Sequence, residues 1–132
     1  MKRYIDSNIF LNALLKEKKE KENAVKIIEN IVSGKMEAFT SALTWDEITY
    51  VLKKFFGKEI AEKQGSKFLK MPNLELISTT KDIITKSQEI FVKYQINPRD
   101  AIHAASAMSI NADIISEDSD FDKIKGIKRI HA

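Results

Sequence analysis

The sequence predicts an α/β fold of three layers, α/β/α, in which a central, mostly parallel sheet is flanked by helices. Two observations lead to this prediction. Short apolar segments with strand character recur along the 132 residues, and longer segments with helical spacing separate them. No internal repeat or linker-like tract interrupts the pattern, so we expect a single domain covering residues 1–132.

Helix signals separate the strands of the first half of the chain. Gly34 and Gly57 are well placed to end helices, and Thr44-Trp45-Asp46-Glu47 reads as a capping box that opens one. The charged run 16–22 contains no apolar residue and is expected to be a solvated helix end or loop. The expected elements are a strand at 2–6, helices at 9–15 and 24–32, a strand at 38–43, and helices at 44–56 and 58–70.

The second half of the chain repeats this alternation. Thr79 or Thr80 can cap one helix, and Asn97-Pro98 begins another, because proline suits the first helical turn. The expected elements are a strand at 74–77, a helix reaching residue 94, a helix at 98–110, a strand at 113–116, a loop or short helix start at 117–121, and a last strand near 128–130.

The composition restricts the chemistry that the chain can perform. There is no cysteine, which excludes disulfides, thiolate zinc sites, iron–sulfur clusters and a cysteine nucleophile. With only two histidines, a metal site would have to use oxygen ligands, and Mg²⁺ or Mn²⁺ is the expected ion. The N-terminus has no signal-peptide pattern and no apolar run could span a membrane, so we expect a cytoplasmic protein without membrane contact. The net charge of +3 is compatible with a nucleic-acid partner.

Four acidic residues stand where a parallel sheet would bring them to one edge. Asp6 follows the first expected strand and Asp118 follows a later one, while Glu47 and Asp100 lie in the first turns of helices. Ligands of open α/β sheets bind outside the carboxyl ends of the strands. Carboxylates gathered there would repel one another, and a divalent cation would relieve the repulsion and activate water for hydrolysis.

Each of these acids also has an ordinary structural explanation. Asp6 could be a helix N-cap or turn residue, and Glu47 could be the last member of the capping box. Asp100 could complement the dipole of its helix, and Asp118 could close an Asx turn. Their spacing alone leaves these readings open.

The order of the motifs resembles that of the PIN-domain family, and within it the VapC toxins of prokaryotic toxin–antitoxin pairs. The resemblance spans nearly the whole chain and rests on the ordered set rather than on one motif. The motifs are Asp6-Ser7-Asn8 behind an N-terminal strand, Glu47 in a helix, the segment from Asp100 to Ala105 (DAIHAA), and Ser116-Glu117-Asp118 followed by Asp120-Phe121.

The resemblance implies a metal-dependent endoribonuclease whose site residues are Asp6, Glu47, Asp100 and Asp118, each holding Mg²⁺ or Mn²⁺. Three further residues would support this site. Asn8 corresponds to the polar residue that orients the first aspartate, and Ser116 stands where the family usually has threonine. Asp120 competes with Asp118 as the fourth acid, although capping the short helix that carries Phe121 is the role we favour for Asp120.

The resemblance also implies partners: an RNA substrate, a cognate small antitoxin and a second copy of the chain in a homodimer. Because Phe55 and Phe56 are adjacent and cannot face the same way, we expect one of them at the subunit contact. The alternatives are a stand-alone RNA-processing nuclease and a non-catalytic RNA-binding domain. His103 lies one turn after Asp100, and its alanine-rich face favours a hydrogen-bonded structural histidine over a general base.

Overall fold

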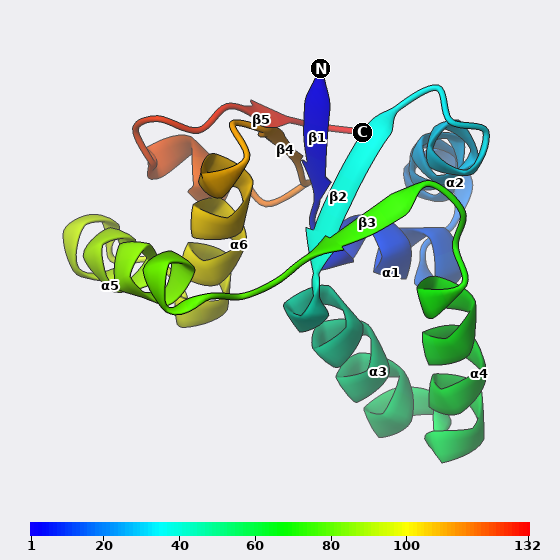
Figure 1. Cartoon of the computed structure of the whole chain (residues 1–132). Helices are drawn as coiled ribbons and strands as arrows, with labels where there is room; N and C mark the ends of the chain where they lie inside the picture. The colour runs from blue at the N-terminus through cyan, green and yellow to red at the C-terminus, as the bar shows by residue number, and fades with distance from the viewer.

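A parallel five-stranded sheet forms the centre of the computed structural model, which describes residues 1–132 (Figure 1). Its strands lie in the order β3-β2-β1-β4-β5, and every neighbouring pair is parallel. The prediction of a mostly parallel sheet between helices is confirmed. The strands are β1 (Lys2–Ile5), β2 (Glu37–Ser41), β3 (Leu74–Ile77), β4 (Asp113–Ile115) and β5 (Arg129–Ile130).

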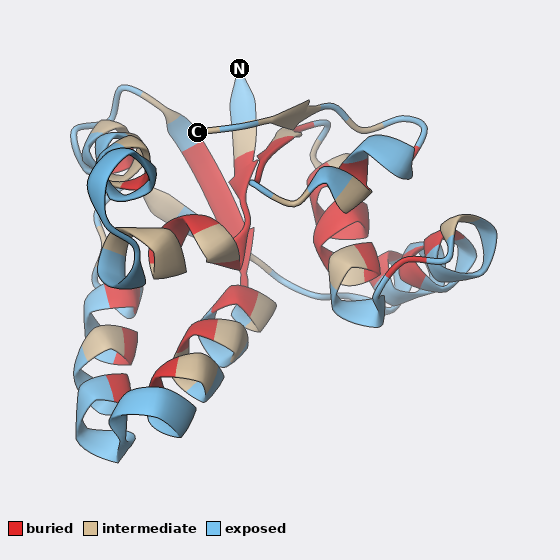
Figure 2. Cartoon of the chain, turned by 180° about the vertical axis from the view of Figure 1, so that it is seen from behind, coloured by how far each residue is buried: buried red, intermediate tan, exposed pale blue.

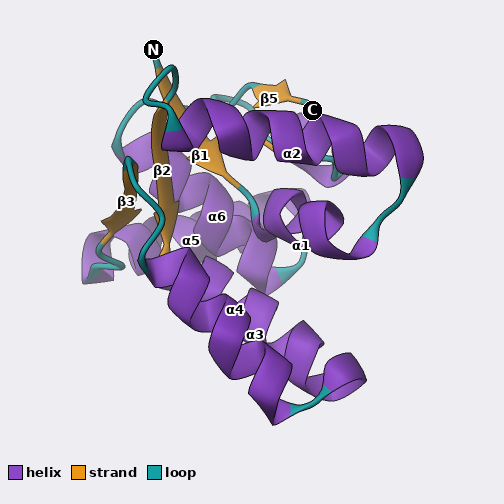
Figure 3. Ribbon diagram, turned by 90° about the vertical axis from the view of Figure 1, so that its right-hand side faces the viewer, coloured by secondary structure: helices purple, strands orange, loops and turns teal.

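Helices cover both faces of this sheet. Helices α5 and α6 lie on one side, and α1, α2 and α4 lie on the other, with α3 extending from the carboxyl end of β2 beside α4 (Figures 1 and 3). The helices are α1 (Ser7–Leu15), α2 (Lys18–Val32), α3 (Ala42–Phe56), α4 (Lys58–Leu69), α5 (Lys81–Tyr94) and α6 (Pro98–Ser109), followed by the short 3₁₀ helix η1 (Ser119–Lys123). No helix is both long and apolar enough to cross a membrane.

The strands divide the core in two because successive side chains of a strand point to opposite faces. Tyr4 and Ile114 pack with α5 and α6, whereas their neighbours Ile5 and Ile115 pack with α1, α3 and α4. Strands β1, β2 and β4 and the inner faces of the helices are accordingly buried along most of their length, whereas the edge strands β3 and β5 are not (Figure 2). This double burial fixes the register of β1 and β4, and with it the position of the residues that follow them.

The start of α3 differs from the prediction. The helix begins at Ala42, after Ser41 as N-cap, so the capping box expected at 44–47 does not form. Thr44 instead pairs with Thr40, whose hydroxyl donates to the carbonyl oxygen of Ile5 at 2.8 Å and lies 2.7 Å from Thr44 Oγ1. Because this polar pair is buried against β1, a tertiary contact replaces the local cap. Glu47 therefore lies in the second turn of the helix.

Two other helix starts come earlier than expected. Helix α1 begins at Ser7, directly after Asp6, and α2 begins at Lys18 within the charged run. Lysine and glutamate are good helix formers, and the Lys16–Glu20 pair, with 3.9 Å between Nζ and Oε2, supports this turn weakly. The absence of apolar residues there means only that the first turn of α2 is exposed.

Candidate active site

The four predicted acids gather at the carboxyl edge of the sheet. Asp6 follows β1 and Asp118 lies three residues beyond β4, while Glu47 projects from α3 and Asp100 from the first turn of α6. The charges of all three other carboxylates raise the pKa of Asp100, so the four acids form one electrostatic cluster.

Asp6 is the innermost of these carboxylates, with 4% of its surface exposed. The Ser116 hydroxyl donates to its Oδ2 at 2.6 Å, and the Ser7 hydroxyl lies 3.4 Å from its Oδ1. Asn8 acts through Ser116, because its amide donates to the Ser116 hydroxyl at 3.1 Å rather than to Asp6 itself. Burial, helped by the negative charge of Glu47, raises the pKa of Asp6, although His103 and Ser116 oppose the rise.

Glu47 reaches the cluster through His103. The imidazole Nε2 hydrogen-bonds Glu47 Oε1 and lies 3.5 Å from Asp6 Oδ1. Ligand atoms of Asp6, Glu47 and His103 all lie within 4.8 Å of one another. His103 is completely buried, and burial lowers its pKa, but its hydrogen bond to Glu47 and the charges of Asp6, Glu47 and Asp100 outweigh this, so its pKa is raised.

Asp100 and Asp118 form the more open side of the cluster. Their carboxylates, with that of Asp120, lie within 4.8 Å of one another, and all three residues are partly exposed. Burial and the neighbouring charges, first that of Asp118 and then that of Asp6, raise the pKa of Asp100 to about 7. A carboxyl with a pKa near neutral pH is both buried and surrounded by negative charge.

The role that we favoured for Asp120 is wrong, because Asp118 is the residue that caps η1. Asp118 Oδ1 accepts from the backbone N–H of Asp120 at 2.9 Å, as in an Asx turn, while its own N–H donates to Ser116 Oγ at 3.0 Å. Asp120 lies in the first turn of η1, where it forms an ion pair with Lys123 at 3.1 Å. Competition between local caps two residues apart cannot be decided from residue types alone.

Sequence reasoning missed two residues that support the cluster, Tyr4 and Arg129, whereas the prediction that His103 is a hydrogen-bonded structural histidine is confirmed. Tyr4 and His103 share a buried hydrogen bond of 2.7 Å between the tyrosine hydroxyl and Nδ1, so His103 is a structural histidine whose other nitrogen faces the acids. Arg129 on β5 grips Asp122 with two hydrogen bonds of 2.9 and 3.0 Å and donates to the Ser116 carbonyl at 3.1 Å. Only the closeness of His103 to Asp100 in the chain gave a signal.

Comparison with known proteins places this arrangement in a family. The sequence matches the family model described as PIN domain over residues 3–127. The chain belongs to the PIN domain family. No curated protein matches the sequence significantly.

Solved structures with the same fold support the assignment of this PIN domain. VapBC2 from Rickettsia felis, bound to a DNA fragment from its promoter, matches with a TM-score of 0.75 and 20% identity over 99% of this chain and 98% of that chain. DNA-bound VapBC from Salmonella typhimurium matches with a TM-score of 0.76 and 15% identity over the same shares, 99% and 98%. VapC20 from Mycobacterium tuberculosis, a toxin that cleaves the sarcin–ricin loop, matches with a TM-score of 0.70 and 16% identity over 91% of this chain and 92% of that chain. At these identities the likeness concerns the fold.

Proposed function

We propose that this PIN domain is a metal-dependent endoribonuclease that hydrolyses RNA phosphodiesters at Asp6, Glu47, Asp100 and Asp118. The observation that carries the proposal is the convergence of these carboxylates, with the pKa of Asp100 raised to about 7 by burial and by the other acids. Strongly perturbed acids gathered at the carboxyl edge of a parallel sheet are typical of a functional site.

The donor atoms fit a hard divalent cation such as Mg²⁺ or Mn²⁺. The four acids offer oxygen ligands, and the chain has no cysteine to favour a softer metal. When bound, the ion would neutralise charge on the scissile phosphate and lower the pKa of the attacking water. It would also remove the carboxylate repulsion that, after burial, raises the pKa of Asp100.

The protein's own contribution is to hold these oxygens in place and to leave one side open. Asp6 is buried and held by Ser116, so it forms the rigid floor of the cluster. Asp100 and Asp118 are partly exposed and form its rim. An RNA strand therefore approaches from the side of Asp100 and Asp118. Its phosphate contacts these two residues before it comes close to Asp6.

The solved structures of similar fold support a role as the toxin of a toxin–antitoxin pair. Several of them are complexes of a VapC-type protein with its partner, and VapC20 is described as cleaving RNA of the sarcin–ricin loop. The partner that we propose is a small antitoxin whose tail places an arginine beside the acids, because a guanidinium can grip a carboxylate with two hydrogen bonds. A stand-alone RNA-processing nuclease is the alternative, and the absence of a small antitoxin gene beside this one would favour it.

A homodimer is the proposed assembly. Phe55 and Phe56, at the end of α3, are 67% and 51% exposed. Two adjacent exposed aromatic side chains form an apolar surface of the kind that a subunit contact would cover. We therefore propose that one of them lies at a subunit contact, and the exposure of both side chains supports this proposal.

The decisive experiment measures cleavage of a labelled stem–loop RNA with Mg²⁺, with Mn²⁺ and with a chelator. We expect cleavage only with metal, and a loss of at least about 100-fold in Asp6→Asn and Asp100→Asn, because each removes an oxygen ligand. Asp46→Asn, which changes the exposed neighbour of Glu47, serves as the control for purity and folding. Equal cleavage by Asp100→Asn and the unaltered protein would refute the assignment of the site.

A further inference from the structure

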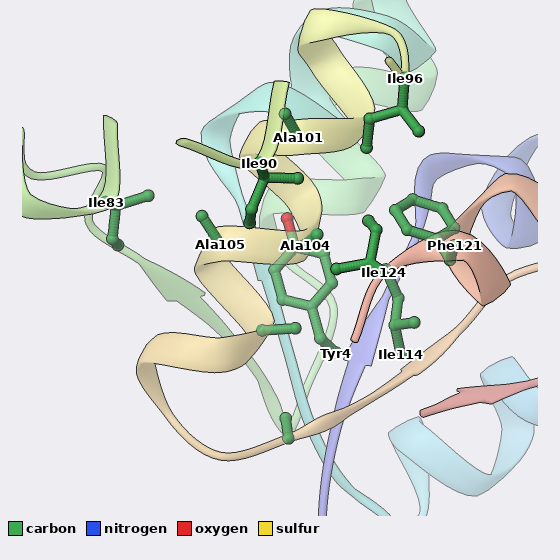
Figure 4. Close-up of a cluster of buried hydrophobic side chains, with 12 residues drawn as sticks. Tyr4, Ile83, Ile90, Ile96, Ala101, Ala104, Ala105, Ile114, Phe121 and Ile124 are labelled. Carbon is green, nitrogen blue, oxygen red and sulfur yellow. The ribbon is translucent and has the colours of Figure 1, made fainter. Parts of the chain in front are cut away.

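A buried tyrosine connects the core to the acidic cluster. Tyr4 on β1 is fully buried, and its ring packs against α6 beside Ala104 and Ala105 (Figure 4). Its hydroxyl oxygen lies 2.7 Å from His103 Nδ1 and 2.8 Å from Ser41 Oγ. The tyrosine and imidazole rings are tilted by 60° with centroids 5.6 Å apart, so they meet through the hydrogen bond rather than by stacking.

The other nitrogen of His103, Nε2, hydrogen-bonds Glu47. Carboxylates such as those of Glu47 and Asp6 accept hydrogen bonds, so the imidazole Nε2 that faces both is the donor. In the neutral imidazole, Nδ1 then accepts from the Tyr4 hydroxyl, which in turn accepts from Ser41; in the protonated imidazole Nδ1 donates to the Tyr4 hydroxyl, and the same contact holds the ring. A hydrogen on Nε2 also leaves this nitrogen without a free lone pair, so His103 is not a metal ligand in this arrangement.

Glu47 depends on this contact more than the other acids do. Asp6 has Ser116 and Ser7 as hydrogen-bond partners, whereas His103 is the only hydrogen-bond partner of the Glu47 side chain. Glutamate also has one more rotatable bond than aspartate, and the Glu47 side chain is 21% exposed. Without a fixed donor beside it, this carboxylate is free to turn toward solvent.

We propose that Tyr4 is a positioning residue of the site: its hydroxyl fixes the ring of His103 so that Nε2–H holds the Glu47 carboxylate beside Asp6. A phenylalanine would fill the same apolar space, so packing alone does not require the hydroxyl. Burying it is tolerated because every buried side-chain polar atom, this hydroxyl included, has a partner. The connection to catalysis rests on the ribonuclease function proposed above, but the Tyr4–His103–Glu47 chain itself does not.

The metal-free protein tests the chain without any activity measurement. The sequence has two histidines, so NMR of isotope-labelled histidine resolves His103, with the exposed His131 as an internal reference. In Tyr4→Phe we expect the nitrogen resonances of His103 to move while those of His131 stay. Tyr50→Phe, which removes an exposed hydroxyl on α3, is the matched control and should move neither.

Cleavage kinetics test the consequence. In Tyr4→Phe we expect a rate about 10- to 100-fold lower and a higher Mn²⁺ requirement, with an unchanged KM for RNA, as for other residues that support metal ligands indirectly. In His103→Gln, whose amide can still donate to Glu47, adding Tyr4→Phe should cost little more, because the two substitutions break one chain. Ser41→Ala, which removes the other partner of the hydroxyl, should change the same quantities in the same direction by less, and replaces Tyr4→Phe if that variant does not fold.

The results separate this inference from the proposed function. Unchanged His103 resonances in Tyr4→Phe, additive losses in the double variant, or nitrogen hyperfine coupling from His103 to bound Mn²⁺ would each overturn the positioning role. If the unaltered protein cleaves no RNA while the His103 resonances respond as expected, the ribonuclease proposal fails and the hydrogen-bonded chain stands.

Discussion

Replacing Asp100 with asparagine should stabilise the metal-free protein. The pKa of this carboxyl is raised from 3.8 to about 7, first by burial and then by the charges of Asp118 and Asp6. Each unit corresponds to about 1.4 kcal/mol, so the full rise would amount to roughly 4 kcal/mol at a pH where the group is ionised. Asp100 is partly exposed, and solvent screening reduces this to about 1–2 kcal/mol.

A smaller term opposes this gain. Asp100 lies in the first turn of α6, where the helix dipole favours a negative charge by about 0.3–1 kcal/mol, and asparagine loses that contribution. The net expectation is about 1 kcal/mol of stabilisation, or about 3–4 °C in Tm for a domain of this size. Asparagine has nearly the same shape as aspartate, and burial and neighbouring charges, rather than a hydrogen bond, set the pKa of the Asp100 side chain that it replaces.

The dependence on pH gives the sharper test. The folded protein holds the Asp100 proton more tightly than the unfolded chain does, so the wild-type protein loses stability as the pH rises from about 4 to about 7. The advantage of Asp100→Asn should therefore be complete above pH 7 and vanish near pH 4. Thermal unfolding in a chelator at several pH values measures it, with Asp46→Asn as control.

Metal should reverse the order of stability. An ion that binds the folded state raises its stability by mass action, and wild-type protein should gain more Tm from Mg²⁺ than Asp100→Asn does, because the variant lacks one ligand. If Asp100→Asn in chelator at pH 8 were no more stable than wild type, or if its advantage grew toward low pH, the carboxylates would not repel one another as we argue.

Three further results are expected. Ser116→Ala leaves buried Asp6 without its donor at 2.6 Å, so urea unfolding should show a loss of about 1–3 kcal/mol, and an unchanged midpoint would contradict this. Light scattering at sub-micromolar concentration should give about twice 15.1 kDa, and Phe55→Ser together with Phe56→Ser should weaken the assembly; a monomer at all concentrations removes the dimer proposal. In a purified complex with the antitoxin, excess Mn²⁺ should weaken inhibition of RNA cleavage, whereas inhibition indifferent to metal would favour a stand-alone nuclease.

Local signals were sufficient for most elements of the fold. The strand at Leu74–Ile77 and the start of α6 at Pro98 lie where apolar runs and the Asn97-Pro98 pair predicted them, because a strand core and a helix cap depend on neighbouring residues. The start of α3 was wrong because it depends on a contact across the sheet, between Thr40 and the backbone of Ile5. A buried polar contact of this kind leaves no trace in the spacing of residues.

The candidate site divides in the same way. The positions of strand ends and helix starts were sufficient to predict that Asp6 and Asp100 lie at the same edge of the sheet. Ser116, 110 residues from Asp6, was expected at the site only because of the family resemblance, and the contact of Tyr4 with His103, 99 residues away, was not predicted. Those pairs meet only because β1 lies between β2 and β4 in the sheet, and this strand order is a property of the whole chain.

The arrangement of supports around the acids explains how the fold tolerates them. The buried side, at Asp6, receives a hydrogen bond from Ser116 and has the imidazole of His103 at 3.5 Å, and both groups oppose the rise that burial causes in the pKa of Asp6. The open side, at Asp100, has no such donor, and its carboxyl keeps a proton near neutral pH instead. A cation that binds on the open side therefore displaces a proton of Asp100 rather than a hydrogen bond. A guanidinium arriving from a partner protein would meet the same excess of negative charge, and this is why inhibition by such a group and activation by metal should compete for one place.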